Sequence, residues 1–281
     1  MERDFQDVGV EFTNESVEQP FPCRKENMSK LSLLVAVVAG FAVVLICRAA
    51  ESSSARVPVL LELFTSEGCS SCPPADRLLE ILDEKQPVAG ADLIVLSEHV
   101  DYWNSLGWKD PFSSPQYSAH QQDYANRYNF DGVYTPQLVV DGRYGFVGSD
   151  GKEASAAIQK AIRERKIPIA ISNLARNGNQ VTARIELPAG ENLKGASGIL
   201  YVALADNRQK SHVARGENGG HTLSHVAVTR VLKQVGSINL GASVKEIALP
   251  IQQGSGNGLR LVAFIQDSRS GRVLGVAQQK L

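Results

Sequence analysis

Two cysteines separated by two residues are the part of this sequence best suited to chemistry. Cys69 and Cys72 follow an apolar run of strand length, Val57–Phe64, and precede apolar residues at helical spacing, Ala75–Leu82. A disulfide across so short a loop restricts the unfolded chain little, which makes it a poor stabilising link. Redox chemistry or metal capture therefore explains the pair better than stability does, and an incidental surface disulfide is the remaining interpretation.

The expected junction of strand and helix also predicts how the two sulfurs differ. Free backbone N–H groups and the positive end of a helix dipole stabilise a thiolate and lower the pKa of a cysteine. Because proline is tolerated only in the first helical turn, Pro74 favours Cys72 near the N-cap, with Pro73 at the first helical position. We expect Cys69 to be the more exposed sulfur, which attacks a partner, and Cys72 to be the resolving one.

A β-hairpin is predicted further along the chain. The runs Gln137–Val140 and Arg143–Val147 flank Asp141-Gly142, a dipeptide typical of tight turns between strands. Thr135 and Pro136 come just before the first of these strands. The hairpin therefore opens on a proline.

The strand, the cysteine pair, the following helix and this hairpin resemble the thioredoxin superfamily. There, a cis proline opens a strand that faces the cysteine pair, so the resemblance implies a cis Thr135–Pro136 bond at the site; an ordinary trans proline is the alternative. The segments Phe64–Asp76, His99–Trp103 and Tyr134–Gln137 are similar to the bacterial family called domain of unknown function 1223, over about residues 56–281. Its members are exported and thioredoxin-like with no settled activity, so this resemblance implies a fold and not a reaction.

The sequence departs from the classical thioredoxin pattern in three places. Gly68 stands where an aromatic residue usually precedes the first cysteine, and the dipeptide between the cysteines is Ser-Ser. The stretch from Cys72 to Pro136 is long for a minimal thioredoxin, and we expect it to hold an additional helix over Ser114–Asn129. These departures leave the redox direction and the partner open.

His99 is a further candidate for the same site. It follows a predicted strand, Asp92–Glu98, and ligands of open α/β sheets bind beyond the carboxyl ends of strands. It could favour the Cys69 thiolate or shuttle a proton. It could also join Cys69 and Cys72 as a ligand for copper(I), or only cap the end of its strand.

Glu62 is the last candidate. It lies inside the otherwise apolar first strand, where a buried carboxylate is costly unless it is neutral or paired. The resemblance implies a buried acid that accepts a proton beneath Cys72, and Glu62 is the candidate for this role. A glutamate that faces solvent from an edge strand is the alternative.

The second half of the chain has a different pattern. A helical pattern over Gly151–Lys166 closes an expected first domain, residues 56–166. Beyond it, short β-like runs separated by turns predict an all-β immunoglobulin-like sandwich over residues 167–281. The seven runs are Ile167–Leu174, Gln180–Leu187, Gly198–Ala205, His225–Val235, Val244–Leu249, Leu259–Gln266 and Arg272–Ala277. The expected fold class is α/β, a thioredoxin-like mixed sheet with flanking helices followed by this sandwich.

One loop of the second half is rich in glycine and histidine. Arg215–His225 and the nearby His212 together hold three of the five histidines. Histidine clusters bind metals, but this spacing matches no zinc pattern and no cysteine is near. A loop between strands is the main interpretation, and such a loop could also reach across the cysteine-bearing face.

The amino-terminal part of the chain carries the one long apolar run, Leu31–Cys47. We interpret residues 28–55 as a signal peptide that starts at Met28, or as an uncleaved membrane anchor. Residues 1–27 contain seven acidic and three basic residues, and we interpret them as a disordered extension. Both interpretations of residues 28–55 place the folded part outside the cytoplasm. It would be periplasmic or secreted, or anchored to the inner membrane by residues 31–47. Thiols outside the cytoplasm tend to be oxidised.

The composition excludes several classes of protein. With 43% hydrophobic residues and a net charge of -1, the chain is neither disordered as a whole nor a dedicated nucleic-acid binder. No glycine-rich phosphate loop opens a helix. We therefore expect an exported thiol–disulfide oxidoreductase that acts on protein or small thiols without a cofactor. A copper(I) metallochaperone using Cys69, Cys72 and His99, and a non-catalytic thioredoxin-like binding protein, are the alternatives.

Overall fold

The part of the chain that the computed structural model describes comprises residues 56–128, 132–188, 197–256 and 258–281. The predicted extension (1–27) and the predicted signal peptide or anchor (28–55) lie outside these ranges. Among the described residues, no helix is both long enough and apolar enough to span a membrane. The described residues belong to one compact unit, residues 54–281.

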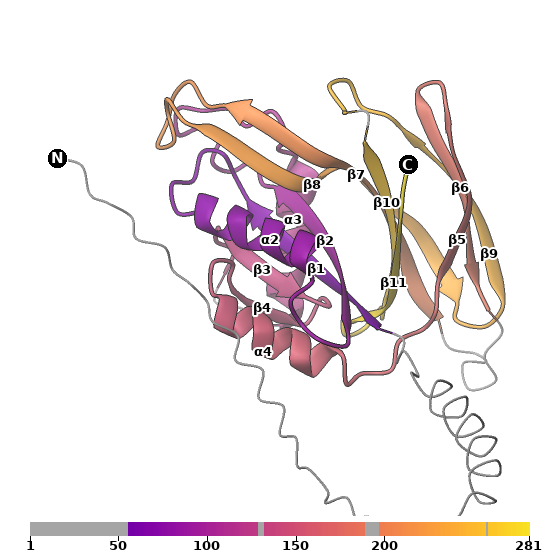
Figure 1. The fold of residues 1–281 in the computed structure, drawn as a ribbon. Helices are drawn as coiled ribbons and strands as arrows, with labels where there is room; N and C mark the ends of the chain where they lie inside the picture. Colours follow the sequence, from indigo (N-terminus) through magenta and orange to yellow (C-terminus); the bar gives the residue numbers. More distant parts are fainter. Residues whose placement is uncertain (1–55, 129–131, 189–196, 257) are drawn as a thin grey trace, which may run out of the picture. The chain divides into compact units, whose positions relative to one another are not determined.

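An eight-stranded mixed sheet organises this unit, in the order β11-β10-β7-β8-β2-β1-β3-β4 (Figure 1). Within it, β1 (Val57–Thr65) pairs in parallel with β2 (Ala91–His99) over its whole length. β3 (Gln137–Val140) runs antiparallel to β1 and forms a hairpin with β4 (Tyr144–Val147). Each of the four strands begins and ends within one residue of its predicted run.

Three helices cover the two faces of these strands. α2 (Pro73–Lys85) and α4 (Gly151–Ala161) pack on one face, and α3 (Pro115–Tyr128), the additional helix expected from the sequence, packs on the other. Because side chains alternate along a strand, odd-numbered residues of β1 such as Leu63 face α2 and α4. Even-numbered residues such as Phe64 face α3. Every polar residue of β1 and β2 is thereby assigned to one of two buried environments.

All seven strands expected in the second half are present. They are β5 (Ala170–Asn177), β6 (Gln180–Leu187), β7 (Ser197–His212), β8 (Thr222–Asn239), β9 (Ser243–Pro250), β10 (Leu259–Gln266) and β11 (Val273–Lys280). β7 and β8 are much longer than the predicted runs and pair with each other from one end to the other. Their hairpin extends beyond the rest of the second half towards β2 (Figure 1).

The pairing of these strands corrects the expected division between residues 166 and 167. Only β5, β6 and β9 form a separate, three-stranded sheet, whereas β7, β8, β10 and β11 continue the sheet of the first half. The link is a parallel contact between Ser97 of β2 and Val228 of β8. One hydrophobic cluster contains both Leu96 of β2 and Phe264 of β10. Strand periodicity cannot predict this link, because it specifies which face of a strand is buried and not which strand lies beside it.

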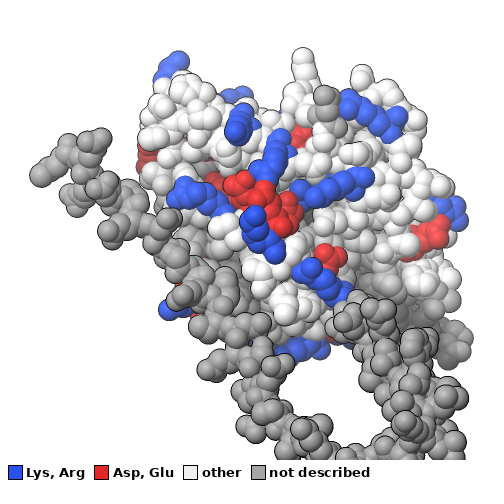
Figure 2. All heavy atoms as spheres, in the orientation of Figure 1, with Lys and Arg blue, Asp and Glu red and all other residues white. Residues whose placement is uncertain are grey.

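Ion pairs also connect the second half to α2. The guanidinium group of Arg260 on β10 is buried and donates to both carboxylate oxygens of Asp83, at 2.7 and 2.9 Å. Arg208 of β7 pairs with Glu80 and Glu84. Acidic and basic side chains accordingly gather beside one another on the face that carries α2 (Figure 2). These acidic residues of α2 bind arginines of the same chain.

Candidate functional site

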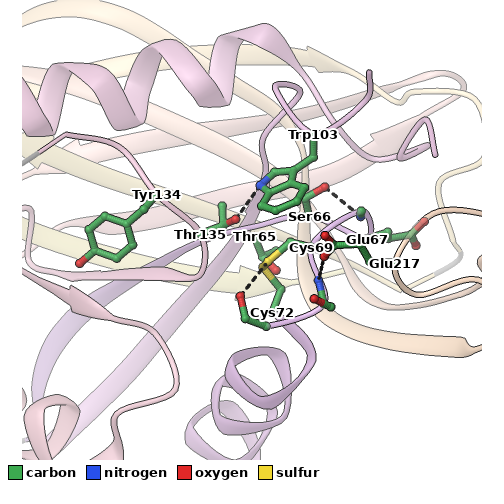
Figure 3. Close-up of a disulfide and its surroundings, with 12 residues drawn as sticks. Thr65, Ser66, Glu67, Cys69, Cys72, Trp103, Tyr134, Thr135 and Glu217 are labelled. Carbon is green, nitrogen blue, oxygen red and sulfur yellow. Dashed lines mark hydrogen bonds between the residues drawn. A yellow bond between two sulfur atoms is a disulfide. The ribbon is translucent and has the colours of Figure 1, made fainter. Parts of the chain in front are cut away.

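The two predicted cysteines form a disulfide at the junction of β1 and α2 (Figure 3). Their Cα atoms lie 5.5 Å apart. Cys72 is the N-cap of α2 and Pro73 is its first residue, as the sequence predicts. The Thr135–Pro136 peptide bond before β3 is cis, in agreement with the expectation.

Trp103 joins the cysteine turn to the loop that carries the cis bond. Its indole Nε1 donates to the Thr135 hydroxyl at 2.7 Å (Figure 3). A Cβ atom at position 68 would lie 3.2 Å from the Trp103 Cβ. A side chain at position 68 would therefore meet Trp103, which occupies that space.

The exposure expected for Cys69 is wrong. Cys69 and Cys72 are both 0% exposed, although Ser70 and Ser71 between them are exposed. The sequence signals concern the local turn and helix, where Cys69 comes first and lies outside the helix. They contain no information about distant segments that lie on this turn.

One such segment is the tip of the β7–β8 hairpin, residues 213–221. The side-chain amide of Asn218 donates to the carbonyl oxygens of Glu67 and Cys69, each at 2.9 Å. The carboxylate of Glu217 accepts from the Ser70 N–H at 2.9 Å, and this contact lowers the pKa of Glu217 (Figure 3). The glycine-rich loop noted in the sequence thus binds the cysteine turn.

A buried group of charged side chains lies on the α2 face of β1 and β2, and we call it the redox-side cluster after the redox role that the sequence predicts for the nearby cysteines. Its members are Glu67, Asp76, His99, Asp110 and His225. His225 of β8 lies between two carboxylates, with Nε2 3.5 Å from Glu67 and Nδ1 3.6 Å from Asp76. Burial lowers the pKa of His225, but Asp76 and Glu67 outweigh it and raise the pKa to about 10. His225 is therefore a buried cation at neutral pH.

His99 is part of this cluster. Among the described residues, it forms no set of closely spaced metal-ligating atoms with the two sulfurs. Its Nδ1 lies 2.7 Å from Asp110, which also accepts the Glu67 N–H at 2.8 Å. Burial raises the pKa of Asp110, but His99 and backbone N–H groups outweigh it and keep the pKa below its usual value. The ring of His99 packs edge-on against His225, with centroids 4.7 Å apart. His99 thus supports the turn that precedes Cys69.

Glu62 is neither beneath Cys72 nor exposed on an edge strand. β1 lies inside the sheet, and Glu62 is fully buried on the α3 face, opposite to the side that packs on α2. It hydrogen-bonds His120 at 2.9 Å and accepts the Tyr124 hydroxyl at 2.6 Å. Glu98 lies beside them, and we call Glu62, Glu98, His120 and Tyr124 the α3-side cluster. The expected role of Glu62 fails because an even-numbered residue of β1 cannot face α2.

Neither metal site considered from the sequence is assembled. Within the described ranges, one set of three metal-ligating side chains has its ligand atoms within 4.8 Å of one another, and it is Glu62, Glu98 and His120. Cys69 and Cys72 are bonded to each other and form no such set with His99. The histidines of the second half also separate. His212 contacts Thr222, His221 is exposed, and His225 is buried in the redox-side cluster.

Sequence reasoning missed most members of both clusters. Asp76 follows Cys72 by one helical turn, and Glu98 ends an apolar run, so both were visible as charges in buried patterns. His225 and His120 carried no such signal, because each gains its role from a residue more than 50 positions away.

Comparison with known proteins identifies the family. The model of a protein family of unknown function, DUF1223, matches residues 60–266. This chain belongs to that family. No curated protein matches it in sequence.

Two solved structures are similar to the DUF1223 chain. A structural-genomics crystal structure of a protein from Agrobacterium tumefaciens is 26% identical, with a TM-score of 0.58 over 80% of this chain and 94% of that one. HBP35 of Porphyromonas gingivalis is 17% identical, with a TM-score of 0.60 over 80% of this chain and 76% of that one. The second likeness concerns the fold alone.

Proposed function

We propose that this protein is an exported thiol–disulfide oxidoreductase that acts on protein or small thiols. The observation that carries the proposal is the Cys69–Cys72 disulfide at the amino end of α2, beside the loop with the cis Thr135–Pro136 bond. This position at a helix start favours a thiolate in the reduced protein. The Ser71 hydroxyl lies 3.3 Å from the Cys69 sulfur and is placed to donate to it.

The proposed reaction is a pair of exchange steps. The Cys69 thiolate attacks one sulfur of a partner disulfide, a mixed disulfide forms, and the other partner sulfur leaves as a thiolate. The Cys72 thiolate then attacks the Cys69 sulfur, which releases the second partner thiolate and closes the Cys69–Cys72 disulfide. Two electrons pass from the protein to the partner, and the reverse sequence oxidises a partner dithiol.

We also propose that β1–β4 and their helices form a thioredoxin-like core, and the strand pairing supports this. β1, β2, β3 and β4 have the parallel and antiparallel neighbours that a thioredoxin-like sheet requires, with helices on both faces. We further propose that β5–β11 are an immunoglobulin-like sandwich, because β6 and β9 of the three-stranded sheet share a buried cluster with β7 and β10 of the large sheet. Its β7–β8 hairpin then acts as a cover over the cysteine turn.

Access is the condition that this proposal must meet. Both sulfurs are fully buried, so a partner reaches Cys69 only when a covering segment moves. The tip at residues 213–221 is held to the turn through the side chains of Asn218 and Glu217. Side-chain contacts of this kind open more readily than strand pairing. We propose that the tip opens to admit the partner.

The burial of both sulfurs also favours a second candidate, a binding protein with a static disulfide. The reduction potential of the pair separates the two. We would measure it on the full chain by equilibration with glutathione and dithiothreitol buffers, with Cys69→Ser as the control. A potential above about -250 mV supports the oxidoreductase, and one below about -300 mV supports the static disulfide.

A further inference from the structure

The α3-side cluster combines the side chains from which proteins build sites for divalent cations. One ligand atom from each of Glu62, Glu98 and His120 lies within 4.8 Å of the other two. The three residues come from three elements, β1, β2 and α3, and all are buried. No step of the proposed exchange reaction uses them.

Glu98 shows that the group lacks a component. Its side chain is fully buried, and neither carboxylate oxygen has a hydrogen-bond partner among the residues that the structure describes. Burial raises the pKa of Glu98 to about 8, which reflects the cost of the charge in this environment. Protonation removes the charge but still leaves a buried hydroxyl without an acceptor. A metal ion beside Glu98 would satisfy its two unpaired oxygens.

The neighbours of Glu62 hold it as outer partners hold a metal ligand. The Tyr124 hydroxyl donates to one Glu62 oxygen at 2.6 Å, and the Gln266 amide donates to the Tyr124 hydroxyl at 2.6 Å. The other Glu62 oxygen points to His120 Nε2 at 2.9 Å. Hydrogen bonds of this kind orient carboxylates that bind metals. For both atoms to bind one ion, the Glu62–His120 contact must open and the ion must displace the proton that Glu98 and Glu62 hold on His120.

We propose that Glu62, Glu98 and His120 form a binding site for one divalent first-row transition metal ion, of which zinc is the representative. Two carboxylates and one imidazole suit such ions, whereas calcium and magnesium require six or more oxygen ligands. Ligands of tetrahedral zinc lie roughly 3.4 Å apart, given bond lengths of about 2.0–2.2 Å, so modest side-chain rotation closes the site. The redox-side cluster is unsuited, because Glu67 and Asp76 contact opposite nitrogens of His225.

The metal content of the full chain tests this site. We would express the protein in zinc-supplemented medium, block free thiols by alkylation, dialyse against a chelator and measure zinc by elemental analysis. A buried ion survives this dialysis, so we expect close to one zinc per chain. Glu98→Gln and His120→Gln are expected to lower the content at least tenfold, while both proteins keep the circular-dichroism spectrum of the wild type.

Glu67→Gln is the matched control, because it neutralises a buried carboxylate of the redox-side cluster and is expected to retain the zinc. If a variant does not fold, the wild type still decides. Protein that has been unfolded in denaturant with a chelator to remove its zinc is then refolded with zinc chloride at a hundredfold excess over the dissociation constant, which is expected to raise its unfolding midpoint by roughly 5–10 °C over protein refolded without zinc. Wild type that carries no zinc after expression and after refolding, or Glu98→Gln that keeps its zinc, would overturn the proposal.

Discussion

Two buried carboxylate–histidine clusters lie on opposite faces of the same two strands, and they solve the problem of buried charge differently. In the redox-side cluster, His225 is a cation between Glu67 and Asp76, at ion-pair distance from both. In the α3-side cluster, His120 hydrogen-bonds Glu62, and against the effect of burial Glu98 and Glu62 raise the pKa of His120 to about 9, but Glu98 has no hydrogen-bond partner among the described residues. Each cluster thus contains a histidine cation, but only on the α3 face does a carboxylate, that of Glu98, lack a hydrogen bond to the described part of the chain at both oxygens, whereas Glu67 and Asp76 each have one oxygen hydrogen-bonded.

The largest effect is expected at the cysteine pair, which lies on the same side of the sheet as the redox-side cluster. Cys69→Ser is expected to abolish exchange with a small disulfide, because it removes the sulfur that attacks the partner. Cys72→Ser is expected to accumulate a mixed disulfide on Cys69, since the resolving thiol is gone. Mass spectrometry after incubation with oxidised glutathione measures both. An adduct on Cys72 in the Cys69→Ser protein would contradict the assigned order of attack.

Removal of each histidine measures how well each cluster balances its charge. His225→Ala leaves two buried carboxylates without their cation and is expected to lower the free energy of unfolding by about 3–5 kcal/mol. His120→Ala removes a cation that faces Glu62 and Glu98, but Glu62 keeps the Tyr124 hydroxyl and Glu98, whose pKa is raised to about 8, takes up a proton, so the expected cost is about 1–3 kcal/mol. Denaturant titration at pH 7 with chelator gives both values. If His120→Ala lowered the free energy of unfolding more than His225→Ala, the α3-side cluster would depend more strongly on its histidine than the redox-side cluster does.

Stability depends on pH partly through His225, and His120, whose pKa is raised to about 9, contributes in the same direction. Its pKa is about 10 in the folded protein, against 6.5 for an unperturbed histidine, so the folded chain keeps a proton that the unfolded chain releases between these values. This contribution to stability is complete below pH 6.5 and is lost as the pH rises towards 10, at up to about 1.4 kcal/mol per pH unit. Denaturant titrations from about pH 6 to 10 are expected to show a shallower decline in His225→Gln. If stability declined equally in the wild type and in His225→Gln, His225 would not hold the proton that the unfolded chain releases.

A smaller effect is expected at the hairpin tip. Asn218→Ala removes two hydrogen bonds to the cysteine turn and is expected to increase the rate of disulfide reduction by dithiothreitol roughly tenfold. Asn179→Ala, in the exposed β5–β6 turn, serves as the control. Equal rates in the wild type and both variants would show that the tip does not limit access.

The smallest effect is expected from Glu98→Gln in zinc-free protein. The substitution keeps the volume of a side chain that makes no hydrogen bond in the described structure, so the free energy of unfolding should change by less than about 1 kcal/mol. Thermal or denaturant unfolding in the presence of a chelator measures it. A loss of several kcal/mol would show that Glu98 already has a strong partner.

Much of the local structure was predictable because its causes are local. The C-x-x-C pair with two following prolines placed Cys72 at the start of α2, and the Asp-Gly dipeptide placed the β3–β4 turn. The cis Thr135–Pro136 bond was predicted from the resemblance and not from propensity. The larger errors concerned distant contacts, namely the exposure of Cys69, the position of Glu62 and the division of the chain after residue 166. Some element ends were also wrong, because β7 and β8 are longer than predicted and α4 ends at Ala161 and not at Lys166.

By itself, the sequence determined the strands, the helices and the order in which the cysteines meet α2, because periodicity, capping and turn chemistry act over a few residues. Only the tertiary structure decided what lies against them. It placed His225 from β8 beside Asp76 of α2, turned Glu62 towards α3, and laid Asn218 on the cysteine turn. These contacts join residues 58 to 149 positions apart, and they exist because strands β1, β2 and β8 lie in one sheet.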